Sequence, residues 1–321
     1  MASSLTHNEF YKEVYKELPA SIQKEFKDTW DQYRILGQGH DLLFFYMFWN
    51  LHKMSTIHKQ LTIIGNNDVQ KFTVNYINWL VENNLYKHES LLFLYGYLIH
   101  HFLDAKLHPL IIYETGDFKN DKNANYNHLY LENQIDATIL KRIDIDPRSY
   151  NMSSIIPSNA VLSKETREIV KNSFSKTYQI TNFDKPFINY NNNTKRFLKL
   201  IRYDPSGIKK KIFKLLDPIL IKTIKPSIFP FVFDGTEAEK NLNLDKKFWT
   251  HPVTGKISDK TFFELYDDGK KEISHMITYL HEAIMDKAPD NEIESIVPDI
   301  SSVTGLSHCE FKIKHIKRKS R

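Results

Sequence analysis

Imidazole and carboxylate side chains recur at intervals of four residues in two neighbouring segments of the chain. His100, Asp104 and His108 are spaced in this way in GYLIHHFLDAKLHP. His128 and Glu132 follow in NHLYLE. Because residues four apart share one face of a helix, each segment would present a stripe of these groups in an otherwise apolar pattern. Buried His, Asp and Glu are costly unless they are paired or bind a metal, and ligands without thiolates suit zinc or a similar divalent ion.

The segments that carry these stripes are expected to be helices. Long apolar-periodic segments and only ten glycines in 321 residues favour a mostly helical protein. Residues 91–107 are apolar on nearly all sides, as is typical of a central buried helix. Because proline restricts the residue before it, Pro109 predicts that His108 lies just past the end of this helix. Residues 130–142 predict a second helix that continues beyond Glu132.

The chain is expected to form a single domain. Its 321 residues are 41% hydrophobic and 13% aromatic, which is ample for a large core, and no internal repeat or linker is evident. We predict an all-α, multi-helix domain over residues 1–289, with a last long helix over residues 260–285. Residues 290–321 are expected to form a basic C-terminal arm that need not be ordered.

Cysteine content and hydropathy indicate the cellular compartment in which we expect the protein. Cys309 is the only cysteine, so no internal disulfide is possible and nothing indicates an oxidising environment. The start, MASSLTHNEFYKEV, lacks the basic residues and apolar run of a signal peptide. The longest apolar run, residues 91–99, is too short to span a bilayer. These features predict a cytoplasmic protein without a transmembrane segment.

Basic residues cluster in the second half of the chain, although the net charge is only +5. The cluster lies in residues 195–214 and includes Lys209, Lys210 and Lys211. Such a basic amphipathic stretch attracts phosphates on lipid, nucleic acid or small esters, and it would suit the surface of an anionic membrane. A solvated helix face explains the same pattern, so both interpretations stay open.

Three further residues are candidates for the same metal centre. Asp41 follows ILGQGH, His58 lies one predicted helix later, and His7 opens the first predicted helix. Each has an ordinary explanation on its own, since Asp41 could cap a helix and a lone histidine is often a surface or core residue. His101 lies about 100° around the helix from His100, and we interpret it as a core or supporting residue.

Taken together, these motifs resemble the zinc-dependent phospholipase C family, which is related to the single-strand-specific zinc nucleases. LGQGHDLLFFY is similar to the family's Gly-rich segment that ends in Pro-Asp before an aromatic helix. The family's Gly-x-x-x-His-x-x-x-Asp, His-Pro and His-x-x-x-Glu motifs are matched by Gly96, His100, Asp104, His108, Pro109, His128 and Glu132. NLDKKFWTHPVTGKISDKTFFELYDDG resembles a segment of cytoplasmic bacterial members, and the resemblance runs from about residue 7 to residue 285.

The resemblance implies two or three zinc ions and a set of ligands. One ion would be held by Asp41, His58, His100 and Asp104. A second would be held by His108, His128 and Glu132. A third would use His7, with Asp104 bridging. The chain departs from the family in having His40 in place of the usual proline, and Met1-Ala2 where secreted members expose a tryptophan.

The implied function is hydrolysis of a phosphoric diester by zinc-activated water, with phospholipid as the expected substrate. Clustered zinc ions neutralise a phosphodiester, lower the pKa of a bound water to about 7 and stabilise the leaving oxygen. We expect Asp41 and Glu132 to be catalytic, and the resemblance suggests that Asp41 both binds metal and orients the attacking water. No Gly-x-Ser-x-Gly motif or phosphate-binding glycine loop offers another chemistry.

Other functions remain open for the same residues. A single-strand nuclease, another phosphodiesterase or a phosphatase would use the same metal cage. The chain could instead be a non-catalytic, metal-stabilised module that binds membranes or nucleic acid. A phosphohydrolase of the His-Asp type would use His7, His40-Asp41 and Asp104, but it leaves the His108-Pro109 and His128/Glu132 motifs unexplained.

Overall fold

The computed structural model describes most of the chain, and what it describes is mostly helical. The described residues are 4–43, 54–66, 68–117, 120–121, 123–155, 161–184, 195–196, 198–200, 204, 206–220, 239–307 and 311–317. The α-helices are α1 (Ser4–Glu17), α2 (Ala20–Phe26), α4 (Met54–Asn66), α5 (Val69–Glu82), α6 (His88–Thr115), α7 (Ala124–Arg142), α8 (Lys164–Tyr178), α10 (Ile208–Leu220), α12 (Phe262–Met285) and α13 (Asp290–Ile296). Two 3₁₀ helices, η1 (Arg34–Asp41) and η3 (Met152–Ile155), and a short antiparallel pair, β1 (Trp249–Thr250) and β2 (Ile257–Ser258), complete the elements. The all-α expectation is confirmed.

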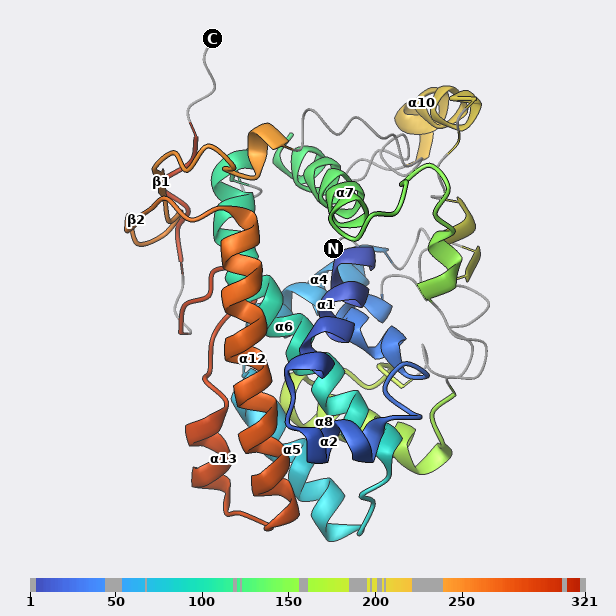
Figure 1. Ribbon diagram of the computed structural model, residues 1–321, viewed down its shortest axis with the longest axis vertical. Helices are drawn as coiled ribbons and strands as arrows, with labels where there is room; N and C mark the ends of the chain where they lie inside the picture. Colours follow the sequence, from blue (N-terminus) through green and yellow to red (C-terminus); the bar gives the residue numbers. More distant parts are fainter. Residues whose placement is uncertain are drawn as a thin grey trace.

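Helix α6 is the central element of the fold (Figure 1). It is buried along most of its length and contacts α1, α5, α7, α12 and η1. Its apolar residues face outward on nearly all sides, so each neighbouring helix has a hydrophobic surface to pack against. This arrangement brings α1, η1 and α7 to the faces of α6 that carry its histidines and its aspartate.

The expected end of this helix at residue 107 is wrong. Pro109 lies inside α6, which continues to Thr115 and keeps His108 in helical geometry. Proline removes the hydrogen bond to the carbonyl four residues earlier, and this loss destabilises the helix interior. Residues 110–112, which follow Pro109, are all buried, and this burial offsets the lost bond.

Helix α12 confirms the long helix expected over residues 260–285. It begins with a capping box, in which the Glu264 amide donates to the Thr261 hydroxyl at 3.0 Å and the Thr261 amide donates to the Glu264 carboxylate at 2.9 Å. Both exchanges satisfy backbone donors that a helix start leaves free. The helix packs along α6 and α1 and so closes one side of the core (Figure 1).

The segment after residue 289 differs in part from the expected basic arm that need not be ordered. It begins with α13, which packs against α5 and α12, and continues into residues 297–307, where Val297, Ser301 and Ser302 are buried. In residues 311–317 the Lys314 amide donates to the Pro252 carbonyl, and the Lys317 amide donates to the Tyr113 carbonyl of α6, each at 2.8 Å. Apolar contacts and backbone hydrogen bonds therefore hold this segment, rather than its basic side chains alone.

The sequence predicts a protein without a transmembrane segment, and helix length and hydropathy test this prediction. Among the helices that the structure describes, none is both long and apolar enough to cross a bilayer. The longest, α6, carries titratable side chains throughout its C-terminal part, at His100, His101, Asp104, Lys106, His108 and Glu114.

Candidate metal centre

Four elements bring the predicted ligands together around one face of α6. The residues fall into two groups on either side of Asp104. The η1 group consists of His7 from α1, His40 and Asp41 from η1, and His100 from α6. The α7 group consists of His108 from α6 and His128 and Glu132 from α7. The two stripes expected from the sequence therefore face a common centre, which elements far apart along the chain complete.

Asp104 joins the two groups. One carboxylate oxygen, Oδ1, lies 3.2 Å from His7 Nε2 and 3.7 Å from His108 Nε2. The other, Oδ2, lies 3.3 Å from His100 Nε2. Burial alone would raise the pKa of the Asp104 carboxyl, but the imidazoles of His108, His100 and His7 hold that pKa well below its ordinary value. Asp104 is therefore a buried carboxylate that faces both groups.

The histidines of the η1 group pack closely upon one another. The ring centroids of His7 and His100 are 4.1 Å apart, and those of His40 and His100 are 4.6 Å apart with nearly perpendicular planes. Burial lowers the pKa of His40 and lowers that of His100 further, so that both rings are held neutral. Among the described residues, the Nδ1 atoms of His7, His40 and His100 have no hydrogen-bond partner.

Two glycines allow η1 to lie against α6 at this point. Gly39 has a φ of +50°, and a Cβ added there would lie 2.5 Å from the ring of His100. A Cβ at Gly96 of α6 would lie 2.7 Å from the backbone of Leu36. Any larger residue would separate the two elements, so these glycines bring His40 and Asp41 within reach of His100.

The α7 group is held by ion pairs and a backbone hydrogen bond, whereas the η1 group is held by ring packing. Glu132 Oε1 lies 2.9 Å from His128 Nε2 and 3.7 Å from His108 Nε2. Burial would raise the pKa of Glu132, but the charge of His128 outweighs this effect and lowers it. Conversely, burial would lower the pKa of His108, but Asp104 and Glu132 raise it. On its other side, His108 Nδ1 donates to the carbonyl of Ser302 at 2.7 Å, which turns Nε2 toward the two carboxylates.

The structure brings together seven of the eight predicted ligands, which are His7, Asp41, His100, Asp104, His108, His128 and Glu132. The eighth, His58, lies in α4, and its side chain is outside the described residues. His101 is fully buried and donates from Nε2 to the Ile300 carbonyl at 2.7 Å, as suits a supporting residue. Lys209, Lys210 and Lys211 lie on α10, which contributes to neither group.

His40 is a further candidate ligand that the sequence motifs did not predict. Its donor atom, one from Asp41 and one from His100 all lie within 4.8 Å of one another. In the sequence it was noted as a departure from the family's proline and as half of the His40-Asp41 pair of the alternative His-Asp phosphohydrolase. The signal that could have identified it is its place directly before Asp41 in a glycine-rich segment.

The donor set fits divalent metal ions. Each group offers imidazole nitrogen and carboxylate oxygen in a buried setting, which is the chemistry that zinc prefers when thiolates are absent. A cavity of about 10 Å³ lies among residues that include His7, Asp104, His108 and Glu132, and this is close to the space of one water-sized sphere. Buried imidazoles without hydrogen-bond partners are costly in a folded protein unless something else binds their lone pairs.

Comparisons with known proteins complete the description of this centre. No family model, curated protein or solved structure matches the chain. The relation to zinc-dependent phospholipases C therefore stays a prediction from the sequence motifs.

Proposed function

We propose that the chain is a metal-dependent hydrolase of phosphoric diesters, most similar to a zinc-dependent phospholipase C. One observation carries the proposal: the Asp104 carboxylate stands between the histidines of both groups, with one oxygen near His7 and His108 and the other near His100. A carboxylate shared by two ligand groups is the arrangement expected of clustered metal ions. Zinc bound there would supply Lewis acidity and a water of lowered pKa for attack on phosphorus.

The residues of this chain have distinct roles in that chemistry. Asp104 holds the two groups in register and carries the negative charge that offsets the metal ions. Asp41 lies beside His40 and His100, where its carboxylate can orient a water and take its proton. Glu132, expected to be catalytic as well, lies between His108 and His128 and completes the α7 group. No separate nucleophile is required.

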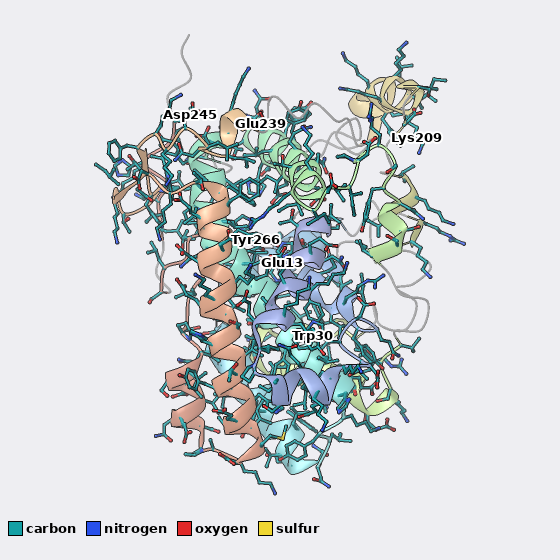
Figure 2. All side chains as sticks on the ribbon, viewed as in Figure 1. Glu13, Trp30, Lys209, Glu239, Asp245 and Tyr266 are labelled. Atoms are coloured by element: carbon teal, nitrogen blue, oxygen red, sulfur yellow. The ribbon has the colours of Figure 1, made fainter. Side chains whose placement is uncertain are left out.

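The substrate class is proposed from α10. Its Ile208, Ile212 and Leu215 are 57%, 50% and 76% exposed and recur at helical spacing on one face. Lys210 and Lys211 are exposed on the same helix, and Lys209 projects from it at the edge of the molecule (Figure 2). An apolar stripe flanked by lysines suits the interface of an anionic bilayer, whereas nucleic acid would need only the positive charge. This favours phospholipid over single-stranded DNA.

Turnover with defined metal content tests the hydrolase. Purified protein is analysed for bound metals and assayed on a chromogenic phosphodiester, before and after treatment with a chelator. We expect at least two zinc ions per chain, loss of turnover with the chelator and recovery on addition of Zn²⁺. Turnover that ignores the chelator would exclude the metal mechanism. Metal binding without turnover on diesters, lipid or single-stranded DNA would favour the non-catalytic module.

Vesicle binding tests the substrate class separately. We expect sedimentation with vesicles of phosphatidylglycerol and phosphatidylcholine to weaken in Ile212→Glu and in the triple change of Lys209, Lys210 and Lys211 to Gln. Phe248→Glu is the matched control, since Phe248 is also a highly exposed apolar residue but lies outside α10. Equal binding by all variants would remove α10 from the proposal, and preferred binding of single-stranded DNA would favour a nuclease.

A further inference from the structure

The C-terminal loop, residues 297–307, follows α13 and lies against α6 behind the metal centre. Two of its backbone carbonyls accept hydrogen bonds from histidines of α6. The Ile300 carbonyl accepts from His101 Nε2, and the Ser302 carbonyl accepts from His108 Nδ1, each at 2.7 Å. The loop therefore contacts His108, a predicted metal ligand, on the side of the ring that faces away from Asp104 and Glu132.

The loop is fixed in place by hydrogen bonds to α4 and by hydrogen bonds within its own backbone. The Ser302 amide and hydroxyl both donate to the carbonyl of Gly65 in α4, at 2.8 Å and 3.0 Å. The Ser301 hydroxyl donates to the Asn66 side chain at 2.9 Å. Within the loop, the Ser301 amide donates to the Leu306 carbonyl at 2.9 Å, and the Gly305 amide donates to the Ser301 carbonyl at 2.8 Å. Such a closed loop, with Val297, Ser301, Ser302 and Thr304 buried, can hold a carbonyl in one position.

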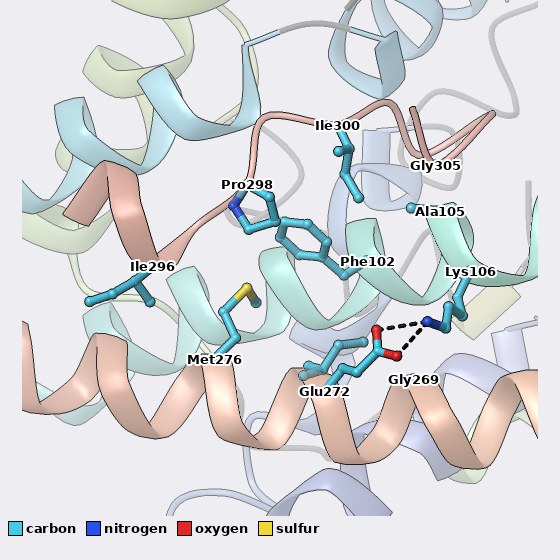
Figure 3. A pocket seen from close by; sticks show the side chains of 11 residues that line it. Phe102, Ala105, Lys106, Gly269, Glu272, Met276, Ile296, Pro298, Ile300 and Gly305 are labelled. Atoms are coloured by element: carbon cyan, nitrogen blue, oxygen red, sulfur yellow. Dashed lines mark hydrogen bonds and ion pairs between the residues drawn. The ribbon is translucent and has the colours of Figure 1, made fainter. Parts of the chain in front are cut away.

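Pro109 explains why the loop can approach α6 so closely. A proline has no amide hydrogen, so Pro109 cannot donate to the carbonyl of Ala105 as a helix requires. Gly305 lies at this carbonyl, where an added Cβ would be 2.6 Å from the Ala105 oxygen. A cavity of about 410 Å³ adjoins this contact and is lined by Phe102, Met276, Pro298 and Ile300 among others (Figure 3). On that side the loop is therefore not closely packed.

We propose that the C-terminal loop is a positioning element for the α7 group: it fixes the tautomer and orientation of His108 and so sets the metal affinity of that group. A neutral imidazole has one donor and one acceptor nitrogen. With Nδ1–H donated to Ser302, the lone pair belongs to Nε2, which faces Asp104 and Glu132. Partners of this kind behind a ligand are worth about 10- to 100-fold in metal affinity. The proposal rests on the metal centre of the proposed function but not on turnover.

Two glycines make a matched test. Gly305 has a φ of +65° and Gly207 a φ of +67°, so alanine meets the same backbone strain at both positions. Only at Gly305 does the new Cβ strike a neighbour, since nothing lies within 4 Å of the Gly207 position. Gly305→Ala should push the loop off α6 and weaken binding of one divalent ion per chain by about 10- to 100-fold. Gly207→Ala should leave all metal affinities unchanged.

Two readouts decide the outcome. Competition of Zn²⁺ and Co²⁺ with a chromophoric chelator measures the affinity of each ion, and His128→Ala identifies the ion that belongs to the α7 group. Equal affinities in both glycine variants would overturn the proposal. The second readout needs no variant and no metal: nitrogen-15 spectra of the metal-free wild-type protein at about pH 9, where histidines are neutral. We expect the proton of His108 on Nδ1, and a proton on Nε2 would overturn the proposal.

These readouts separate this proposal from the proposed function. A protein that binds metal without turnover leaves the affinity test intact. A protein that binds no metal ends the proposed function and also the role of the loop in metal affinity, while the His108 spectrum still tests whether the loop fixes the tautomer. If Gly305→Ala loses its helical circular dichroism, the spectrum of the wild-type protein is decisive by itself.

Discussion

The η1 group and the α7 group share Asp104 but are supported in different ways. In the η1 group, ring packing and the close approach of Gly39 to His100 set the geometry, and the Nδ1 atoms of His7, His40 and His100 have no hydrogen-bond partner among the described residues. In the α7 group, a backbone carbonyl fixes the ring of His108 from behind. A hydrogen bond defines a tautomer, whereas ring packing leaves both tautomers available.

If the centre binds metal as proposed, the difference means that the ligands of the α7 group are oriented before an ion binds, whereas those of the η1 group are not. We expect the α7 group to bind its ion with its ligands already oriented. In the η1 group, His7 faces Asp104 through Nε2, whereas His100 has no hydrogen-bond partner at either nitrogen among the described residues, so metal binding would settle which nitrogen of that ring is used. Substitutions can disrupt the η1 group, the α7 group, or Asp104, which links the two.

The largest effect is expected from Asp104→Asn, because this change removes the charge shared by both groups. An amide cannot supply two anionic oxygens to His7, His100 and His108. We expect turnover to fall by more than about a hundredfold and the bound metal to decrease in both groups. Metal analysis beside the diester assay measures this, with the exposed Asp146→Asn as the control. Full metal content in Asp104→Asn would mean that the two groups are independent.

The next largest effect is expected from Gly39→Ala, which acts on the η1 group alone. The new Cβ would meet the His100 ring at 2.5 Å and would also strain the backbone at its φ of +50°. We expect the free energy of unfolding to fall by about 1–3 kcal/mol and the η1 group to lose affinity for its ion. Urea denaturation and chelator competition measure the two effects. Loss of the α7 ion instead would contradict the division into two groups.

His40→Ala should have a smaller effect, since it removes one imidazole without moving the backbone. We expect weaker metal binding in the η1 group and no change in the α7 group. His275→Ala is the control, because His275 is an exposed histidine of α12. If His40→Ala binds all ions with wild-type affinity, His40 is a packing residue beside the centre.

The sequence predicted the parts of this centre that depend on local periodicity. A spacing of four residues defines a helix face whatever lies nearby, so the stripes at His100/Asp104 and at His128/Glu132 were visible in the sequence. His7 and Asp41 were candidates from their residue types and positions, and the resemblance to a family then assigned them to particular ions. The convergence of four elements on Asp104 depends on packing that spacing alone does not encode.

The errors have physical causes as well. Pro109 is a valid signal for the end of a helix, but burial of residues 110–112 outweighs it. The C-terminal loop acts through the carbonyls of Ile300 and Ser302, and backbone carbonyls are the same in every residue, so no sequence pattern marks them. His40 was missed because its role depends on the approach of η1 to α6.

The smallest expected effect is on the pH dependence of stability in the metal-free protein, and here the two groups have opposite signs. Burial lowers the pKa of His100 and of His40, so the unfolded chain binds more protons than the folded one below about pH 6.5. Their contribution is present above that pH and is lost as the pH falls. His108 has a raised pKa, so its contribution is present below about pH 6.5 and is lost as the pH rises through the folded value.

Two substitutions read out these signs separately. Glutamine does not titrate, so His100→Gln should flatten the fall in the free energy of unfolding between about pH 6.5 and pH 5, where each such group contributes a slope of up to about 1.4 kcal/mol per pH unit. His108→Gln should remove the stabilisation at low pH and make the fall steeper relative to the value at pH 8. Urea denaturation in the presence of a chelator at several pH values measures both. Changes of the same sign in the two variants would mean that the groups do not differ in their electrostatic support. The pKa of a buried histidine rises only where carboxylates and other acceptors outweigh the cost of desolvation.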